Sequence, residues 1–164
     1  MLSNALQKAL NEQIKNELYS SYLYLAMSAH FEAASFPGFA KWTRMQAAEE
    51  QEHAMKFFDY VNDRGGRVVL KAITQPPIEF GTPVEVFTAI LEHEQKVTGL
   101  IHALYETAVK AKDYSTQVML HWFINEQVEE EKNATAIVEQ LHMIEDPKGI
   151  IIHVDHRLGK RGAD

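Results

Sequence analysis

The sequence of 164 residues contains no cysteine, so disulfide bonds and thiolate sites for metals or redox chemistry are excluded. Any metal must be held by oxygen and imidazole ligands. No apolar run approaches the roughly 20 residues that a membrane-spanning helix needs, which argues against a membrane protein. The first four residues show neither the basic region nor the apolar core of a signal peptide, and we therefore expect a cytoplasmic protein.

Positive charge is also in short supply, because 16 Lys and Arg residues stand against 23 Asp and Glu residues. The net charge of -7 argues against a nucleic-acid partner and is compatible with attracting cations. The remaining composition, 46% hydrophobic and 24% charged, is that of an ordinary globular protein. A chain of this length is expected to form one domain with a sizeable core.

Breaks in the helical pattern predict four long helices, over about residues 3–32, 37–64, 82–112 and 113–144. Ser3 and Thr82 can cap the first and third helices, and a glycine pair follows the second. Residues 146–149, Asp-Pro-Lys-Gly, are expected to end the fourth helix, and the tail has room for a small helix around residues 153–158. We therefore expect a bundle over residues 1–145 and a C-terminal tail over residues 146–164.

The connections between the long helices predict their directions. The connection after the second helix can span about 55 Å when extended, whereas that helix is about 42 Å long. It can therefore return along the whole bundle and make the second and third helices parallel, while the two short connections force antiparallel neighbours. The expected fold is all-α: a four-helix bundle with one long crossover between the second and third helices, plus a short C-terminal helix.

Each long helix carries an acidic residue inside its apolar stripe when residues are plotted at about 100° each. These four acids are Glu17, Glu50, Glu94 and Glu130. Each lies near the middle of its helix, so the packing brings the acids to one level. His53 and Gln127 share these inward faces, whereas no lysine or arginine does. Because a buried carboxylate without compensation is strongly disfavoured, the pattern predicts bound cations.

Oxygen ligands combined with one imidazole suit iron or manganese better than a structural zinc ion. His53 follows Glu50 by three residues, so both side chains can reach the same metal from one helical face. We expect two iron ions, the first held by Glu17, Glu50 and His53 and the second by Glu50, Glu94 and Glu130, with Gln127 close by. Two ferrous ions held together can each give one electron to dioxygen.

Four runs of the sequence carry a resemblance to a known family: Asn11–Gln13, Glu17–Ser21, Glu49–His53 and Glu126–Glu131. Through these runs the chain resembles the bacterial non-haem ferritins over its whole length. The resemblance implies a ferritin-like iron-storage protein with ferroxidase activity, in which 24 subunits form a shell around a ferric oxyhydroxide mineral. Ferroxidase roles are implied for Glu17, Glu50, His53, Glu94, Gln127 and Glu130. The resemblance further implies a third iron site near Glu49, Glu126, Glu129 and Glu130, and an electron-donor role for Tyr24.

The sequence departs from related di-iron proteins at two positions. Asn133 stands where a second Glu-x-x-His motif would place its histidine after Glu130. With the neutral amide of Gln127 and no second imidazole, the second iron is expected to be held more weakly and passed on. Bacterioferritins ligate haem through a methionine just after the second-helix glutamate, where this chain has Gln51, so we expect no haem.

Two other interpretations remain open from the sequence. A stand-alone di-iron peroxidase like the erythrins is disfavoured by the missing cysteine module and the missing second Glu-x-x-His motif. A non-catalytic helical scaffold with an acidic core would lose no oxygen chemistry if its buried acids were replaced. The first helix also has a second apolar edge, made by Leu18, Tyr22, Leu25 and Ala29, which predicts symmetric self-association.

Overall fold

The structure, a computed structural model, describes residues 2–143 and 150–162. Within these residues it is built from helices alone, with the bounds α1 Asn4–Ala33, α2 Pro37–Asp63, α3 Pro83–Lys110, α4 Tyr114–His142 and α5 Ile150–Leu158. The four long helices predicted from the sequence are confirmed, and α5 begins three residues before the predicted short helix. The predicted helix stop at residues 146–149 and the boundary between residues 145 and 146 lie outside the described residues.

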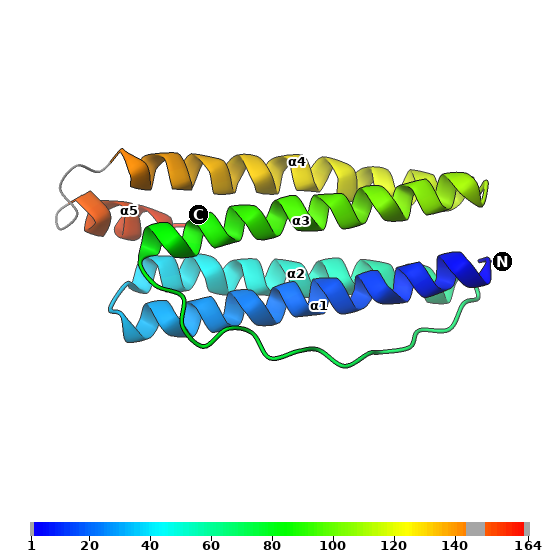
Figure 1. Ribbon diagram of the computed structural model, residues 1–164, viewed down its shortest axis with the longest axis horizontal. Helices are drawn as coiled ribbons and strands as arrows, with labels where there is room; N and C mark the ends of the chain where they lie inside the picture. The colour runs from blue at the N-terminus through cyan, green and yellow to red at the C-terminus, as the bar shows by residue number, and fades with distance from the viewer. Residues whose placement is uncertain (1, 144–149, 163–164) are drawn as a thin grey trace.

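The four long helices lie side by side in the predicted directions (Figure 1). α1 and α2 are antiparallel, and the segment between α2 and α3 then runs back along the length of the bundle. As a result α3 begins at the same end as α2 and runs parallel to it, while α4 returns antiparallel to α3. The long crossover is therefore confirmed. No helix in the described part of the chain is long and apolar enough to cross a membrane.

Local side-chain contacts explain where the helices begin. Ser3 Oγ accepts a hydrogen bond from the backbone N–H of Leu6, which caps α1 at a distance of 3.2 Å. At α3, Thr82 and Glu85 form a capping box in which each side chain accepts from the backbone N–H of the other residue. Asp113 caps α4 as Ser3 caps α1, because its Oδ1 accepts a hydrogen bond of 3.0 Å from the backbone N–H of Thr116. These contacts involve residues only three positions apart, which is why the sequence pattern predicts them.

Two apolar clusters fill the bundle on either side of its middle. One contains Phe31, Phe39 and Phe87, whose ring centroids lie 5.2 to 5.9 Å apart. The other includes Phe57 and Phe123, which stack with centroids 3.9 Å apart. Burying such side chains stabilises the fold by about 1.5 to 3 kcal/mol each. The central turns of the four long helices lie between these clusters, where the four acids occur.

α5 docks on the beginning of α2 through one buried carboxylate. Asp155 is 6% exposed, and its Oδ1 accepts a hydrogen bond of 2.7 Å from the backbone N–H of Phe39 in the first turn of α2. Gly38 makes this approach possible, because a Cβ at that position would lie 1.8 Å from the carbonyl oxygen of Asp155. Lys41 also donates to the carbonyl oxygen of Gly159, at 2.9 Å. The C-terminal segment is thereby placed along α2.

The buried cap on α2 predicts that Asp155→Ala destabilises the protein. Losing an N-terminal cap costs about 1 kcal/mol, which corresponds to a fall of roughly 2 to 4 °C in the thermal midpoint. Asp155→Asn keeps an oxygen acceptor and should lose less. His156→Ala, at the exposed neighbouring position, is the control. Equal thermal midpoints for Asp155→Ala and His156→Ala would contradict the capping role.

Candidate metal centre

The six residues predicted to face the interior all lie there, with exposed fractions between 1% and 7%. They are Glu17 on α1, Glu50 and His53 on α2, Glu94 on α3, and Gln127 and Glu130 on α4. All come from turns near the middle of a long helix, where the apolar stripes converge. Their burial is therefore confirmed, while their role as ligands stays a prediction.

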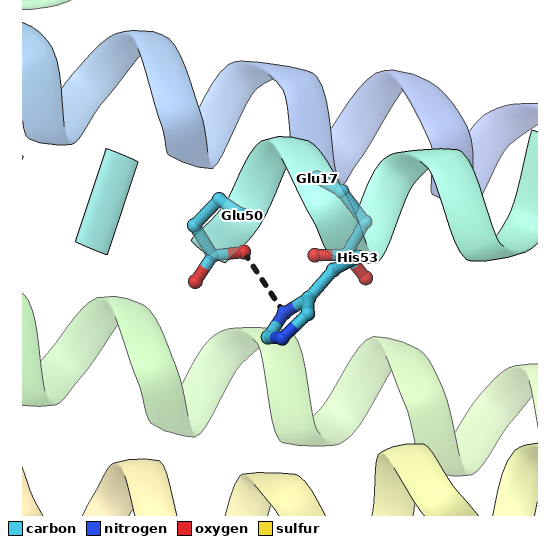
Figure 2. Close-up of side chains that lie close together, drawn as sticks. All are labelled: Glu17, Glu50 and His53. Carbon is cyan, nitrogen blue, oxygen red and sulfur yellow. Dashed lines mark ion pairs between the residues drawn. The ribbon is translucent and has the colours of Figure 1, made fainter. Parts of the chain in front are cut away.

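Three of these residues form a compact group of metal-binding type (Figure 2). Glu17, Glu50 and His53 each offer one ligand atom, and the three atoms lie within 4.8 Å of one another. Glu50 Oε2 lies 3.6 Å from His53 Nδ1, which is too long for a good hydrogen bond. Among the described residues, Glu50 Oε2 is the one fully buried side-chain oxygen or nitrogen without a hydrogen-bond partner. A buried carboxylate oxygen of this kind suits a cation.

The other half of the cluster is more fully hydrogen-bonded. Glu94 accepts hydrogen bonds from the hydroxyl of Tyr24 and from Gln127 Nε2, the latter at 3.2 Å. Glu130 Oε2 accepts from Gln46 Nε2 at 3.0 Å. These donors are neutral, so they satisfy lone pairs without compensating charge. The cluster thus has a first group, made by Glu17, Glu50 and His53, and a second group, made by Glu94, Gln127 and Glu130. The two groups differ in their contacts, as the missing second histidine leads one to expect.

Two glutamines in the surroundings of the acids were not predicted from the sequence. Gln13 is 3% exposed and donates to Glu17 Oε1 at 2.8 Å, and Gln46 is 1% exposed and donates to Glu130. Each lies four residues before a buried acid on its own helix, Gln13 before Glu17 and Gln46 before Glu50. An amide one turn before an inward acid is therefore the sequence signal that could have identified them.

Burial makes the acids hold protons more tightly than usual. It raises the pKa of Glu17 and of Glu50 well above the ordinary value, and the charges of nearby acids add to the effect. For Glu130, burial and then the charges of Glu94 and Glu49 raise the pKa to about 7. The salt bridges of the described ranges connect none of the four acids to a lysine or arginine. Cations can therefore replace the protons.

The residues predicted for a third iron site do not form one compact group. Glu49 makes a salt bridge with Arg161 at the C-terminal end, with a shortest distance of 2.7 Å. Glu126 lies beside the first group instead, with Oε1 4.0 Å from His53 Nε2, and Glu129 is exposed. In the part of the chain that the structure describes, only Glu17, Glu50 and His53 bring three ligand atoms within 4.8 Å. The third site stays a prediction.

Tyr24 lies against the second group, where its hydroxyl donates a hydrogen bond to Glu94. It is 1% exposed, and burial followed by the charge of Glu94 raises its pKa well above the ordinary value. The ring of His93 packs edge-on against it, with centroids 6.1 Å apart, and His93 Nε2 lies 2.8 Å from Ser20 Oγ. Burial lowers the pKa of His93 to about 4, so this imidazole is neutral at physiological pH. The electron-donor role of Tyr24 stays a prediction.

Known proteins resemble this chain in sequence and in fold. A family model described as the ferritin-like domain matches residues 7–144. The chain is 44% identical over 161 residues to the bacterial non-heme ferritin of Bacteroides fragilis (strain 638R), covering 98% of this chain and 100% of the relative. It is 40% identical over 164 residues to that of Staphylococcus haemolyticus (strain JCSC1435), covering 100% and 99%. A solved structure of an open pore ferritin from the hyperthermophilic archaeon Archaeoglobus fulgidus superposes with a TM-score of 0.97 at 45% identity, covering 98% and 99%. The predicted resemblance is confirmed.

The raised pKa of Glu130 predicts that the metal-free protein loses stability as pH rises. The folded protein holds this proton up to about pH 7, whereas an ordinary glutamate releases it near 4.5. The free energy of unfolding should therefore fall between these values, by about 3 kcal/mol for Glu130 alone. With a chelator present, Glu130 alone should lower the thermal midpoint by roughly 6 to 12 °C over this pH range, and the raised pKa values of Glu17 and Glu50 should add to the fall.

Glu130→Gln should remove the part of this pH dependence that comes from Glu130 and leave the part that comes from Glu17 and Glu50. Glu129→Gln, on the exposed face of the same helix, is the matched control and should keep the dependence of the unchanged protein. A slope that is the same in both variants would contradict the assignment to Glu130.

Proposed function

We propose that this chain, which belongs to the ferritin family, is an iron-storage protein with ferroxidase activity. It oxidises Fe(II) to Fe(III) with dioxygen inside each bundle and stores the product as a ferric oxyhydroxide mineral inside a shell of its own copies. The observation that supports this function most directly is the unpartnered Glu50 Oε2, buried beside His53 and Glu17. Iron as the metal and storage as the role are inferred from the family relationship.

The acids and the imidazole would hold the two ferrous ions as substrates. Glu17, Glu50 and His53 surround the first ion, and Glu50, Glu94 and Glu130 surround the second, with Gln127 beside it. Each ferrous ion gives up one electron, and the two electrons with two protons reduce one dioxygen molecule to hydrogen peroxide. Entry of the metal displaces the protons that burial keeps on the carboxyl groups, so the cluster is charged only when cations compensate it.

The unequal halves of the cluster favour turnover over permanent retention of iron. The second group has the amide of Gln127 in place of an imidazole, and Glu94 and Glu130 already accept hydrogen bonds from neutral donors. A metal there must compete with these donors for the carboxylate oxygens. We infer that the second ion is held more weakly and moves on after oxidation to a third site near Glu49, Glu126, Glu129 and Glu130. Tyr24 is the candidate electron donor beside it.

Further properties belong to the same proposal. The chain binds no haem, because the residue after Glu50 is Gln51, an exposed amide. It acts in the cytoplasm and has neither nucleic acid nor membrane as a partner. The bundle of residues 1–145 forms the wall of a shell of 24 subunits, and residues 146–164 form its tail. Tyr22 and Leu25, 48% and 47% exposed on α1, support an apolar contact between copies.

Replacing metal ligands should separate iron oxidation from folding. In Glu50→Ala and His53→Ala the initial rate of Fe(II) oxidation should fall by about 100-fold, the upper end of what losing even an outer partner costs a metal site. Stopped-flow absorbance after mixing anaerobic Fe(II)-loaded protein with oxygen measures this rate. Glu52→Ala, on the exposed face of the same turn, should keep the full rate.

The thermal stability of the same variants helps to distinguish a ferroxidase from a non-catalytic helical scaffold. Glu50→Ala removes an uncompensated buried acid, so the metal-free variant should unfold at a higher temperature than the unchanged protein. If Glu50→Ala and His53→Ala oxidise Fe(II) at the same rate as the unchanged protein and are more stable, the cluster does not catalyse the oxidation. The bundle is then a helical scaffold without ferroxidase activity.

The storage function predicts a large particle with a large iron load. Light scattering should give a mass close to 24 times the 18.7 kDa of one chain. After repeated additions of Fe(II) in air, the ferric content should exceed the two ions per chain of the oxidation site many times over. A monomer that stops at two ions per chain would be a stand-alone di-iron enzyme.

A further inference from the structure

Arg161 connects the C-terminal segment to the edge of the acidic cluster. Its Nη2 lies 2.9 and 2.7 Å from the two carboxylate oxygens of Glu49, and its Nη1 donates to Gln46 Oε1. The guanidinium also lies over the ring of Trp42, 5.2 Å from the centroid. All three partners are on α2, so the side chain is held at three points. The docking of α5 through Asp155 brings it there.

The contact with Gln46 reaches a predicted iron ligand. Gln46 is fully buried, and its Nε2 donates to Glu130 Oε2 at 3.0 Å. A guanidinium offers only donors and a carboxylate offers only acceptors, so an amide between them has one favourable orientation. Its oxygen must face Arg161 and its nitrogen must face Glu130. Arg161 therefore determines how Glu130 is hydrogen-bonded without touching it.

We propose that Arg161 is an internal counter-cation of the iron path and a positioning residue for Glu130. In the metal-free protein it neutralises Glu49 and, through Gln46, holds Glu130 in place. Iron that moves outward to Glu49 displaces the guanidinium and takes over its carboxylate. The Gln46 amide is then free to turn, and Glu130 is released from its neutral donor. This inference rests on the proposed function, because it assumes that iron passes along these acids.

Displacement is physically reasonable because the salt bridge is partly open to solvent. The side chains of Arg161 and Glu49 are 27% and 37% exposed, and ion pairs in such settings are weak compared with a multiply charged cation. A pocket of about 330 Å³ between α2, α4 and α5 borders Arg161 and gives the side chain room to move. Trp42, Gln140 and Leu158 line this pocket.

Calorimetric titration with Zn²⁺, which does not change its oxidation state, tests the competition. We expect two ions per chain at the buried site in every protein, and further Zn²⁺ that binds roughly fivefold more tightly in Arg161→Gln than in the unchanged protein. Arg157→Gln is the matched control: it removes one positive charge from α5, but Arg157 contacts Gln140 and not Glu49. It should leave the weaker binding unchanged.

The outcomes separate this inference from the proposed function. If two ions bind at the buried site but the later binding is the same in Arg161→Gln and Arg157→Gln, the role of Arg161 is wrong and the proposed function stands. If no protein binds the first two ions, the proposed function is wrong and so is this inference. Arg161→Lys keeps the charge but lacks the fork that holds two partners, so it should restore the weaker binding only in part.

Tryptophan fluorescence can report whether the guanidinium of Arg161 moves when Zn²⁺ binds. If Arg161 had only a structural role, Zn²⁺ would leave the emission of Trp42 unchanged. The sequence contains two tryptophans, so Trp122→Phe leaves Trp42 under Arg161 as the only one. Beyond two equivalents of Zn²⁺, the emission of Trp42 should change as the guanidinium leaves its ring. The change should disappear when Arg161→Gln is added to the same background. No change in Trp122→Phe, or an equal change in both proteins, would overturn the displacement.

Discussion

A buried acidic side chain can ionise in a protein core only if a positive charge compensates it, and the middle of this bundle holds four such side chains. The apolar clusters on either side, with their packed phenylalanines, stabilise the helices well enough to keep the acids in place. The acids therefore need positive charge from protons or from bound cations. A core of this kind suits a protein that must take in cations and release them, because the fold does not supply the compensation itself.

The polar side chains around the acids donate hydrogen bonds to them but do not supply this positive charge. Gln13, Gln46, Gln127 and the hydroxyl of Tyr24 donate hydrogen bonds to the carboxylates, yet none of them carries a charge. The hydrogen bonds fix the orientation of the oxygens, and the charge is left to metal ions or protons. The exception is Glu50 Oε2, which has no donor and lies beside the imidazole of His53. The tightest binding is expected where the protein offers the least compensation.

The C-terminal segment places a fixed positive charge, Arg161, at the edge of the cluster. Asp155 binds the first turn of α2, and Arg161 then reaches Glu49 and Gln46 farther along the same helix. A segment that would count as a tail in the sequence thus contacts residues beside the candidate metal centre. Its charge lies outside the group of four acids, so it does not neutralise them. It influences them through one amide and one neighbouring carboxylate.

Local pattern was enough to predict the helices, their caps and the inward direction of the four acids. A cap depends on residues three positions apart, and the face of a residue depends on the turn of its own helix, so both are visible in Ser3, Thr82 and the stripe around Glu17. The long crossover could be predicted because chain length limits direction. The contacts between Tyr24 and Glu94, Gln46 and Glu130, and Arg161 and Gln46 could not, since they join residues 70, 84 and 115 positions apart. Such pairs depend on how each helix is rotated against its neighbours and on where α5 docks, and only the packed tertiary structure decides these two things.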